Sequence, residues 1–377
     1  MTRVRILAVD DEPGMLRAIG RVLGAAHDVT ISGSSREALA RAAAAPPDLA
    51  ILDIRMPELD GFELMERLTA LHPNIDVILM TGSIDDQDEK LVRAIRGAAF
   101  YFIQKPFDRD VLRTLVDRCV EMRRRREDNR RYVQRLEREL DAARTFQQGL
   151  LPDAEAVAGG VRISCRHTPS SELGGDLYDY APDRSGGTAL LIADVAGHGA
   201  AAAMLTAVVK SAFRASEPDG YDPLAVTERV RRSVAAFGEE RFVTLIAMQI
   251  SRRTPGHEGM LSFVNAGHPP GLLWNAGGRL ERLAATGLLI SPALPYLGWN
   301  RVTVPFAPGD HVLLYTDGAT DALFREMDGE SRIRATIAQH VAGGPGLLDA
   351  ILADIGCHRP HRAPEDDITL VTATLSA

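Results

Sequence analysis

Four aspartates in the second half of the chain have the spacing and neighbours of metal ligands. They lie in GGDLYDY (174–180), LLIADVAGHG (190–199), HVLLYTDGATDA (311–322) and EDDITLVT (365–372), as Asp176, Asp194, Asp317 and Asp366. Each adjoins a hydrophobic run, so each carboxylate is predicted at the end of a strand. Such carboxylates would repel one another unless a cation neutralised them, and Mg2+ and Mn2+ prefer oxygen ligands. The pattern indicates a polynuclear metal site.

Composition limits the class of protein that could hold this site. A chain of 377 residues, 45% hydrophobic and 25% charged, is predicted to be globular with two or three domains. Its net charge of -8 gives no general attraction to nucleic acid or to anionic membranes. The widely spaced Cys119, Cys165 and Cys357 predict neither a disulfide framework nor a zinc ribbon. With no signal-peptide core and no long apolar run, we expect a cytoplasmic protein.

Residues 1–119 predict a doubly wound α/β domain. Five strand-like runs alternate with helical patterns, which is typical of a parallel sheet: VRILAVD, HDVTIS, LAILD, DVILMTG and AFYFIQK. Ligands of such sheets bind at the carboxyl ends of the strands. Asp10 and Asp11 follow the first run and Asp53 follows the third, so these acids are predicted to meet there.

This half resembles a two-component receiver domain over essentially all of residues 3–119. The resemblance rests on VDDEP, LDIRMPELDG, MTG and QKPF. It implies that Asp53 accepts a phosphoryl group, and that Thr81 and Lys105 contact it. It also implies that Asp10 or Asp11, Asp53 and the Arg55 carbonyl hold Mg2+. A carboxylate nucleophile needs a cation and a lysine for this chemistry.

Phe102 lies three residues before Lys105, at the position of the family's aromatic switch. The resemblance implies that its ring moves inward when Thr81 engages the phosphoryl group. A core aromatic on the last strand is the alternative interpretation.

Residues 120–150 predict a helical coiled-coil linker, within a long helix that starts near residue 107. Apolar and polar residues at alternating three and four spacings form the seam: Leu112, Leu115, Cys119, Met122, Arg126, Asn129, Val133, Leu136, Leu140, Ala143, Gln147 and Leu150. Arg126 and Asn129 would weaken the zipper while fixing its register. The basic run at 123–126 could contact DNA, but the acids that follow favour a solvated flank.

Residues 151–377 predict an α+β sandwich with two antiparallel sheets flanked by helices. Strand-like runs with hairpin-like turns dominate this part, and helical stretches are expected at 199–215, 222–237 and 330–355.

Here the sequence resembles the metal-dependent PPM-type serine/threonine phosphatases of the SpoIIE and RsbU branch, over about residues 145–375. FQQGLLP, GGDLYDY, DVAGHG, NAGHPP, YTDGATDA and EDDITLV carry the resemblance. It implies that Asp194 bridges two Mn2+ or Mg2+ ions and that the Val195 carbonyl binds one of them. Asp317 and Asp366 would complete one shell, and Asp176 would serve the other ion. Asp367 takes a place where many relatives carry Asn.

Two cations can activate a water for in-line attack on a phosphoserine or phosphothreonine, so no covalent nucleophile is needed. His198 could protonate the leaving oxygen, or could instead be structural. His268 in NAGHPP is expected to shape a turn rather than to bind metal.

Together the parts suggest a response regulator whose phosphatase output is switched by phosphorylation of Asp53. The resemblance implies a cognate histidine kinase or phosphotransfer protein, a receiver and coiled-coil homodimer, and a phosphorylated STAS-domain anti-sigma-factor antagonist as substrate in a stress response. A catalytically inactive scaffold and a DNA-binding regulator are the rival hypotheses. We expect no nucleic-acid or membrane partner.

Overall fold

A computed structural model describes residues 3–82, 99–171, 173–197, 199–238, 241–251, 259–275, 277–323, 328–340, 346–358 and 364–376. The chain divides into two compact units, Met1–Arg135 and Leu136–Ala377. The helix α5 (Arg109–Leu150) runs through this division. One continuous helix covers residues 119 and 150, so the domain boundaries expected at these two positions stay predictions.

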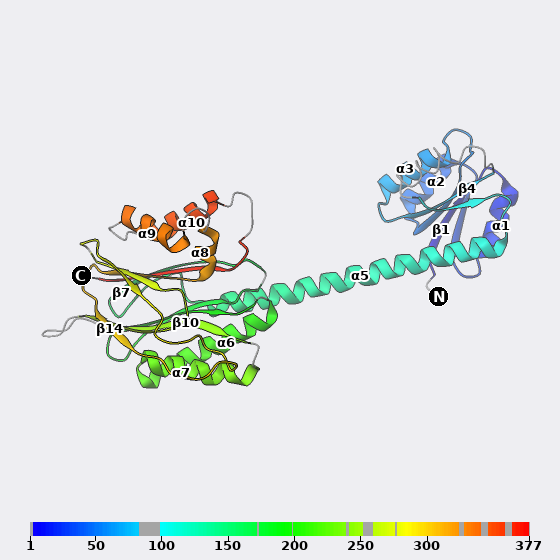
Figure 1. The fold of residues 1–377 in the computed structure, drawn as a ribbon. Coiled ribbons are helices and arrows are strands. Elements are labelled where there is room, and N and C mark those ends of the chain that lie inside the picture. Colours follow the sequence, from blue (N-terminus) through cyan, green and yellow to red (C-terminus); the bar gives the residue numbers. More distant parts are fainter. Residues whose placement is uncertain are drawn as a thin grey trace. The chain divides into compact units, whose positions relative to one another are not determined.

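The first unit is a doubly wound parallel sheet with strand order β2-β1-β3-β4-β5 (Figure 1). Besides α5, its described elements are β1 (Arg5–Val9), α1 (Pro13–Leu23), β2 (Asp28–Ser32), α2 (Ser35–Ala44), β3 (Leu49–Asp53), α3 (Gly61–Leu71), β4 (Asp76–Thr81) and β5 (Ala99–Gln104). The predicted five-stranded receiver fold is confirmed.

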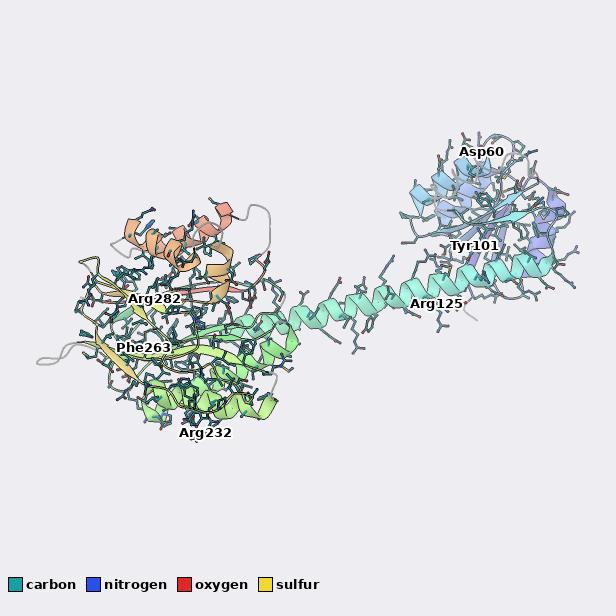
Figure 2. All side chains as sticks on the ribbon, in the orientation of Figure 1. Asp60, Tyr101, Arg125, Arg232, Phe263 and Arg282 are labelled. Atoms are coloured by element: carbon teal, nitrogen blue, oxygen red, sulfur yellow. The ribbon has the colours of Figure 1, made fainter. Side chains whose placement is uncertain are left out.

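Alternating side chains of the strands form two cores, one on each face of this sheet. Leu7 and Val9 pack with residues of α2 and α3, while Ile6 and Ala8 pack with residues of α1 and α5. Side-chain caps begin the helices of the first face: the Asp60 carboxylate, labelled in Figure 2, accepts from the Glu63 amide at the start of α3.

The helix α5 changes character along its length. Leu112, Val116 and Cys119 are buried in the receiver core, so the first part of the expected seam belongs to that core instead. Beyond it, Arg123 donates to Asp48 at 3.0 Å and Arg126 to Asp76 at 2.7 Å, which ties the helix to the ends of the neighbouring strands. Figure 2 shows Arg125 on this stretch.

The second unit has two antiparallel sheets, ordered β14-β11-β10-β9-β8 and β13-β12-β15-β16-β7-β6 (Figure 1). Its strands are β6 (Glu155–Ala158), β7 (Val161–Thr168), β8 (Asp176–Pro182), β9 (Thr188–Val195), β10 (Val243–Ser251), β11 (Met260–Ala266), β12 (Gly271–Trp274), β13 (Leu280–Leu283), β14 (Val302–Pro305), β15 (His311–Tyr315) and β16 (Ile368–Leu375). Its helices are α6 (Ala200–Arg214), η1 (Glu217–Asp219), α7 (Pro223–Val234), η2 (Ala235–Phe237), α8 (Asp317–Leu323), α9 (Gly329–Gln339) and α10 (Leu347–His358).

Three apolar layers hold this unit together. The inner faces of the two sheets enclose a core that includes Ile192, Leu314 and Phe263, the last labelled in Figure 2. A second core joins the β8–β11 sheet to α6 and α7, and a third joins the other sheet to α8, α9 and α10. The predicted sandwich is confirmed. The stretch expected to be helical at 330–355 holds two helices, α9 and α10, and the Gly-Gly-Pro run at 343–345 lies between them.

No helix in the described part of the chain combines the length and the apolar character needed to cross a membrane.

A buried ion cluster ties β8 to α6. The Asp179 side chain is 1% exposed and accepts from Lys210 Nζ at 2.8 Å and Arg214 Nε at 2.7 Å. Replacing Asp179 with Ala would leave both cations without this partner, but water can reach Lys210 and Arg214, whose side chains are 18% and 44% exposed. We therefore expect a loss of about 1.5–3 kcal/mol in the free energy of unfolding. Urea denaturation of the second unit measures this. The matched control is Asp153→Ala, at an exposed position, with a change within about 0.5 kcal/mol; an equal effect of both variants would contradict the prediction.

Candidate functional site

The first acidic site lies at the carboxyl ends of β1 and β3. One ligand atom each from Asp10, Asp11 and Asp53 lies within 4.8 Å of the others. Asp10 and Asp53 are buried, and Asp11 is exposed. The parallel register places these residues at one edge of the sheet, as expected from the sequence.

A lysine reaches into this cluster from the end of β5. Lys105 Nζ donates to Asp10 at 2.7 Å and to Asp53 at 2.8 Å. Burial opposes the charge on Lys105, but these two bonds outweigh it and raise its pKa. Burial raises the pKa of Asp53 although the bond from Lys105 opposes that rise. One ammonium against three carboxylates leaves negative charge uncompensated, so the donor set fits a hard divalent cation.

The other predicted receiver residues lie on the neighbouring strands. Thr81 ends β4, and its carbonyl accepts from the Lys105 amide at 2.7 Å, so the two residues lie at the same edge. Phe102, on β5, is partly buried against the core beneath α2 and α3. Its switching role and the use of the Arg55 carbonyl as a metal ligand stay predictions.

The second site collects aspartates from both sheets of the second unit. Asp176 and Asp194 are paired directly across β8 and β9. Asp176 starts its strand, while Asp194 is next to last in its own. Asp317 begins α8, and Asp366 precedes β16. All four therefore lie within two residues of a strand terminus, Asp176 and Asp366 at the start of a strand and Asp194 and Asp317 at the finish of one. Antiparallel pairing brings the start of one strand to the finish of its neighbour.

Glycines allow the segments to approach one another. A Cβ on Gly175 would collide with the Val195 carbonyl and lie 3.4 Å from an Asp194 carboxylate oxygen. A Cβ on Gly318 would collide with the Asp367 carbonyl, so Asp317 is held beside the 366–367 backbone. The Gly-Asp and Asp-Gly pairs of the motifs are thus packing requirements.

Asp176 is held by residues that sequence reasoning missed. It is buried, and one of its carboxylate oxygens accepts from Thr316 Oγ1 at 2.7 Å and from Thr369 Oγ1 at 2.6 Å. His167 Nδ1 lies 2.9 Å from the Thr369 hydroxyl. Thr316 directly precedes Asp317, and one residue separates Thr369 from Asp367. A threonine hydroxyl at such a position can form many kinds of hydrogen bond, so only the folded geometry identifies these two as partners of Asp176.

Asp367 braces the loop before Asp176. Its two oxygens accept from the Ser170 amide and the Gly175 amide, each at 2.7 Å. It is 3% exposed, whereas its neighbour Asp366 is exposed. Of this Asp-Asp pair, Asp366 is therefore the more accessible carboxylate, with its Oδ1 accepting from the Asp367 amide at 2.8 Å.

The four carboxylates form an acidic row that runs from buried Asp176 through partly buried Asp194 to exposed Asp317 and Asp366. Burial, followed by repulsion from Asp317, Asp366 and Asp367, raises the pKa of Asp194 to about 7. Burial and then Asp194 raise the pKa of Asp176, and burial and then Asp366 raise that of Asp317.

Such a row could hold divalent cations, because a cation would offset both the cost of burying charged carboxylates and their mutual repulsion. Within the described residues, no three of the four bring ligand atoms within 4.8 Å of one another. Bound to the row, such cations would supply a water of lowered pKa and neutralise phosphoryl charge.

Two histidines, His198 and His268, were singled out from the motifs of this half of the sequence. His198 lies outside the described residues, so its role as an acid stays a prediction. His268 is buried, its Nδ1 lies 2.7 Å from Thr244 Oγ1, and burial lowers its pKa to about 3. Its amide donates to Asn265 Oδ1 at 2.8 Å, which fits the expected role in a turn.

The parallel receiver sheet with its acidic pocket, and the antiparallel sandwich with its aspartate row, define a receiver domain joined to a domain of the PP2C fold. Residues 6–117 match the response regulator receiver domain, and residues 184–376, just over half of the chain, match Stage II sporulation protein E (SpoIIE). The chain belongs to the SpoIIE family.

Individual relatives match one half or the other. Phosphoserine phosphatase RsbP of Bacillus subtilis (strain 168) is 30% identical over 189 residues, which are 49% of this chain and 45% of that protein. Transcriptional regulatory protein GlrR of Escherichia coli (strain K12) is 35% identical over 119 residues, 31% of this chain and 26% of that one. The chain thus spans less than half the length of these curated relatives.

Among solved structures, the SiaA-PP2C domain of Pseudomonas aeruginosa is similar with a TM-score of 0.55 and 22% identity. The match covers 64% of this chain and 98% of that chain. At this identity the likeness shows the fold of the second unit.

The bonds to Asp176 generate a test. Thr369→Val keeps the side-chain shape but removes a donor that orients the carboxylate, so we expect Mn2+ affinity to fall about 10- to 100-fold. Isothermal titration calorimetry measures this affinity. Thr372→Val, on the same strand with its hydroxyl bonded to the Ser164 carbonyl, is the control. Equal affinities for Thr369→Val and the unaltered protein would show that the hydroxyl does not prepare Asp176 for metal.

Proposed function

We propose that this protein is a response regulator whose output is a metal-dependent serine/threonine protein phosphatase. One observation carries the proposal: in a SpoIIE-family sandwich Asp176 is paired with Asp194 across two strands, burial raises the pKa of Asp194, and Asp317 and Asp366 lie close enough to raise it further. Divalent cations would offset this repulsion. The similarity to a phosphoserine phosphatase over half of the chain supports the same chemistry. Hydrolysis by a metal-activated water requires no covalent intermediate on the protein.

In this proposal each acid has a separate role. Asp194 bridges two Mn2+ or Mg2+ ions, and the Val195 carbonyl binds one of them. Asp317 and Asp366 complete one shell, and Asp176 serves the other ion, directly or through water. The contact of Gly175 with both Asp194 and Val195 supports a shared position for these groups. His198 would protonate the leaving oxygen.

The receiver would supply the control. Asp10, Asp11, Asp53 and the Arg55 carbonyl would hold Mg2+, and Asp53 would accept a phosphoryl group from a histidine kinase or phosphotransfer protein. Thr81 and Lys105 would then contact the phosphoryl oxygens, and Phe102 would report the change. The bonds from Lys105 to Asp10 and Asp53 support this assignment, because they place a cation beside the acceptor oxygen.

The helix α5 would carry the signal through a homodimer. Val133, Leu136 and Leu140 are spaced as seam residues and are exposed in the single chain, so a second copy would cover them. At the end of α5, Gln147 Nε2 donates to the Gly174 carbonyl at 2.7 Å, and the Gly174 amide donates back to Gln147 Oε1 at 3.2 Å. Gly174 lies two residues before Asp176, so a change in α5 would reach the proposed metal site through these two hydrogen bonds and a short stretch of backbone.

The proposed substrate is a phosphorylated STAS-domain anti-sigma-factor antagonist, a separate protein. Its dephosphorylation would release a sigma factor in a stress response. This part of the proposal rests on the family resemblance stated above.

Phosphatase activity is the first test. We expect hydrolysis of p-nitrophenyl phosphate and of a phosphoserine peptide that depends on Mn2+ or Mg2+. Asp194→Ala removes a proposed direct metal ligand. Loss of a residue that only supports a ligand lowers activity by up to about 100-fold, so we expect this variant to lose at least that much phosphatase activity. Phosphate release measures both, with Asp153→Ala as the control. Metal binding without turnover in the unaltered protein would favour an inactive scaffold.

The switch is tested by comparing phosphatase rates with and without beryllofluoride, which mimics a phosphoryl group on Asp53. We expect the rate of the unaltered chain to change and the rate of Asp53→Asn to stay constant, because the mimic needs the aspartate oxygen. Sedimentation measures dimerisation in the same samples. Unchanged rate and unchanged dimerisation in the unaltered chain would refute the coupling.

A further inference from the structure

An arginine lies beside the loop that carries Asp194. Arg241 precedes β10, and its Nη1 lies 3.6 Å from the position that a Cβ on Gly197 would occupy. The Ala196 amide donates to the Phe242 carbonyl at 3.0 Å, so the backbone on both sides is joined at this point. The Arg241 guanidinium therefore lies beside Gly197, three residues after Asp194.

The same segment also lies beside Gly175 and the Asp194 carboxylate. The Val195 and Gly197 carbonyls both approach the Cβ position of Gly175, from which an Asp194 oxygen is 3.4 Å away. Gly197 has a φ of 94°, a left-handed conformation that glycine adopts without strain, and it leaves space where a side chain would stand. The guanidinium thus adjoins the metal-ligand segment with only a glycine between them.

Arg241 also differs from other arginines of this unit. Arg214 bonds Asp179, Arg229 bonds Asp219, and Arg332 bonds Asp354. With the residues that the structure describes, Arg241 makes no ion pair and no side-chain hydrogen bond, although it is partly buried. Among the described residues, therefore, no carboxylate pairs with its charge.

The ligand that fits is an anion brought to the metal site. The charges acting on Asp194 come from other carboxylates, and metal ions would neutralise those acids. A phosphomonoester then adds about two further negative charges on oxygens that point away from the ions. A guanidinium stays charged and presents paired donors that match phosphoryl oxygens.

We propose that Arg241 binds a phosphoryl oxygen of the phosphoserine or phosphothreonine substrate, opposite the metal-binding carboxylates. The inference rests on the phosphatase function proposed above and adds a substrate-binding residue to it. Arg241 would hold the phosphoryl group before and during hydrolysis, and it would retain orthophosphate as the product.

The test compares Arg241→Ala, Arg241→Lys and the control Arg162→Ala, which changes an exposed arginine on β7. For Arg241→Ala we expect the inhibition constant of orthophosphate and the KM for p-nitrophenyl phosphate to rise about 10- to 100-fold, the range for a hydrogen bond to a charged group. Arg241→Lys should lie between, because it keeps the charge without the fork. The Mn2+ concentration for half-activation should not change in any variant.

Two results would overturn the inference. One is an unchanged orthophosphate inhibition constant in Arg241→Ala; the other is a raised KM for a phosphoprotein alone, which would place the contact on the protein part of the substrate. Should Arg241→Ala fail to fold, the same comparison is made with Arg241→Lys. Calorimetric binding of orthophosphate to the Mn2+-loaded protein needs no turnover, so it separates failure of this inference from failure of the proposed activity.

Discussion

Repulsion between carboxylates held close together is the constraint on which both halves of this protein depend. In the receiver half, Lys105 offsets part of it by bonding Asp10 and Asp53. In the other half, the groups found to act on Asp194 are further acids, and the bonds that Asp176 accepts come from neutral hydroxyls. The first site is thus partly neutralised by the chain itself, whereas the charges that act on Asp194 in the second are all negative.

The fold must hold the second set of acids together against this repulsion. Paired strands fix Asp176 opposite Asp194, and the close contact at Gly318 fixes Asp317 beside Asp366. The Asp367 carboxylate accepts hydrogen bonds from backbone amides, and these bonds hold the loop before Asp176 in place. Three apolar cores hold the strands and helices that carry these acids, so the acids are positioned by close packing.

The sequence was a good guide wherever one type of residue had few possible uses. The strands of both domains follow from runs such as LAILD and LVTATL, and the acids follow from their motifs. It was a poorer guide where a side chain has many uses: Thr316, Thr369 and His167 support Asp176 only because distant strands meet. The seam of α5 shows the same limit, since Leu112 and Cys119 satisfy its spacing but lie in the receiver core. Periodicity identifies an apolar face without identifying what covers it.

The pairing of Gln147 with Gly174 means that the support of the aspartate row begins before the first strand of the sandwich. A fragment cut at residue 151 would keep every described strand of the second unit and the four aspartates Asp176, Asp194, Asp317 and Asp366. It would lose the side chain that bonds both polar groups of the Gly174 backbone. The last turns of α5 therefore support the segment that carries Asp176, although they lie outside the sandwich. A recombination event that attached this output to another sensor would have to exchange the helix upstream of Gln147, which limits where new regulatory domains can be joined.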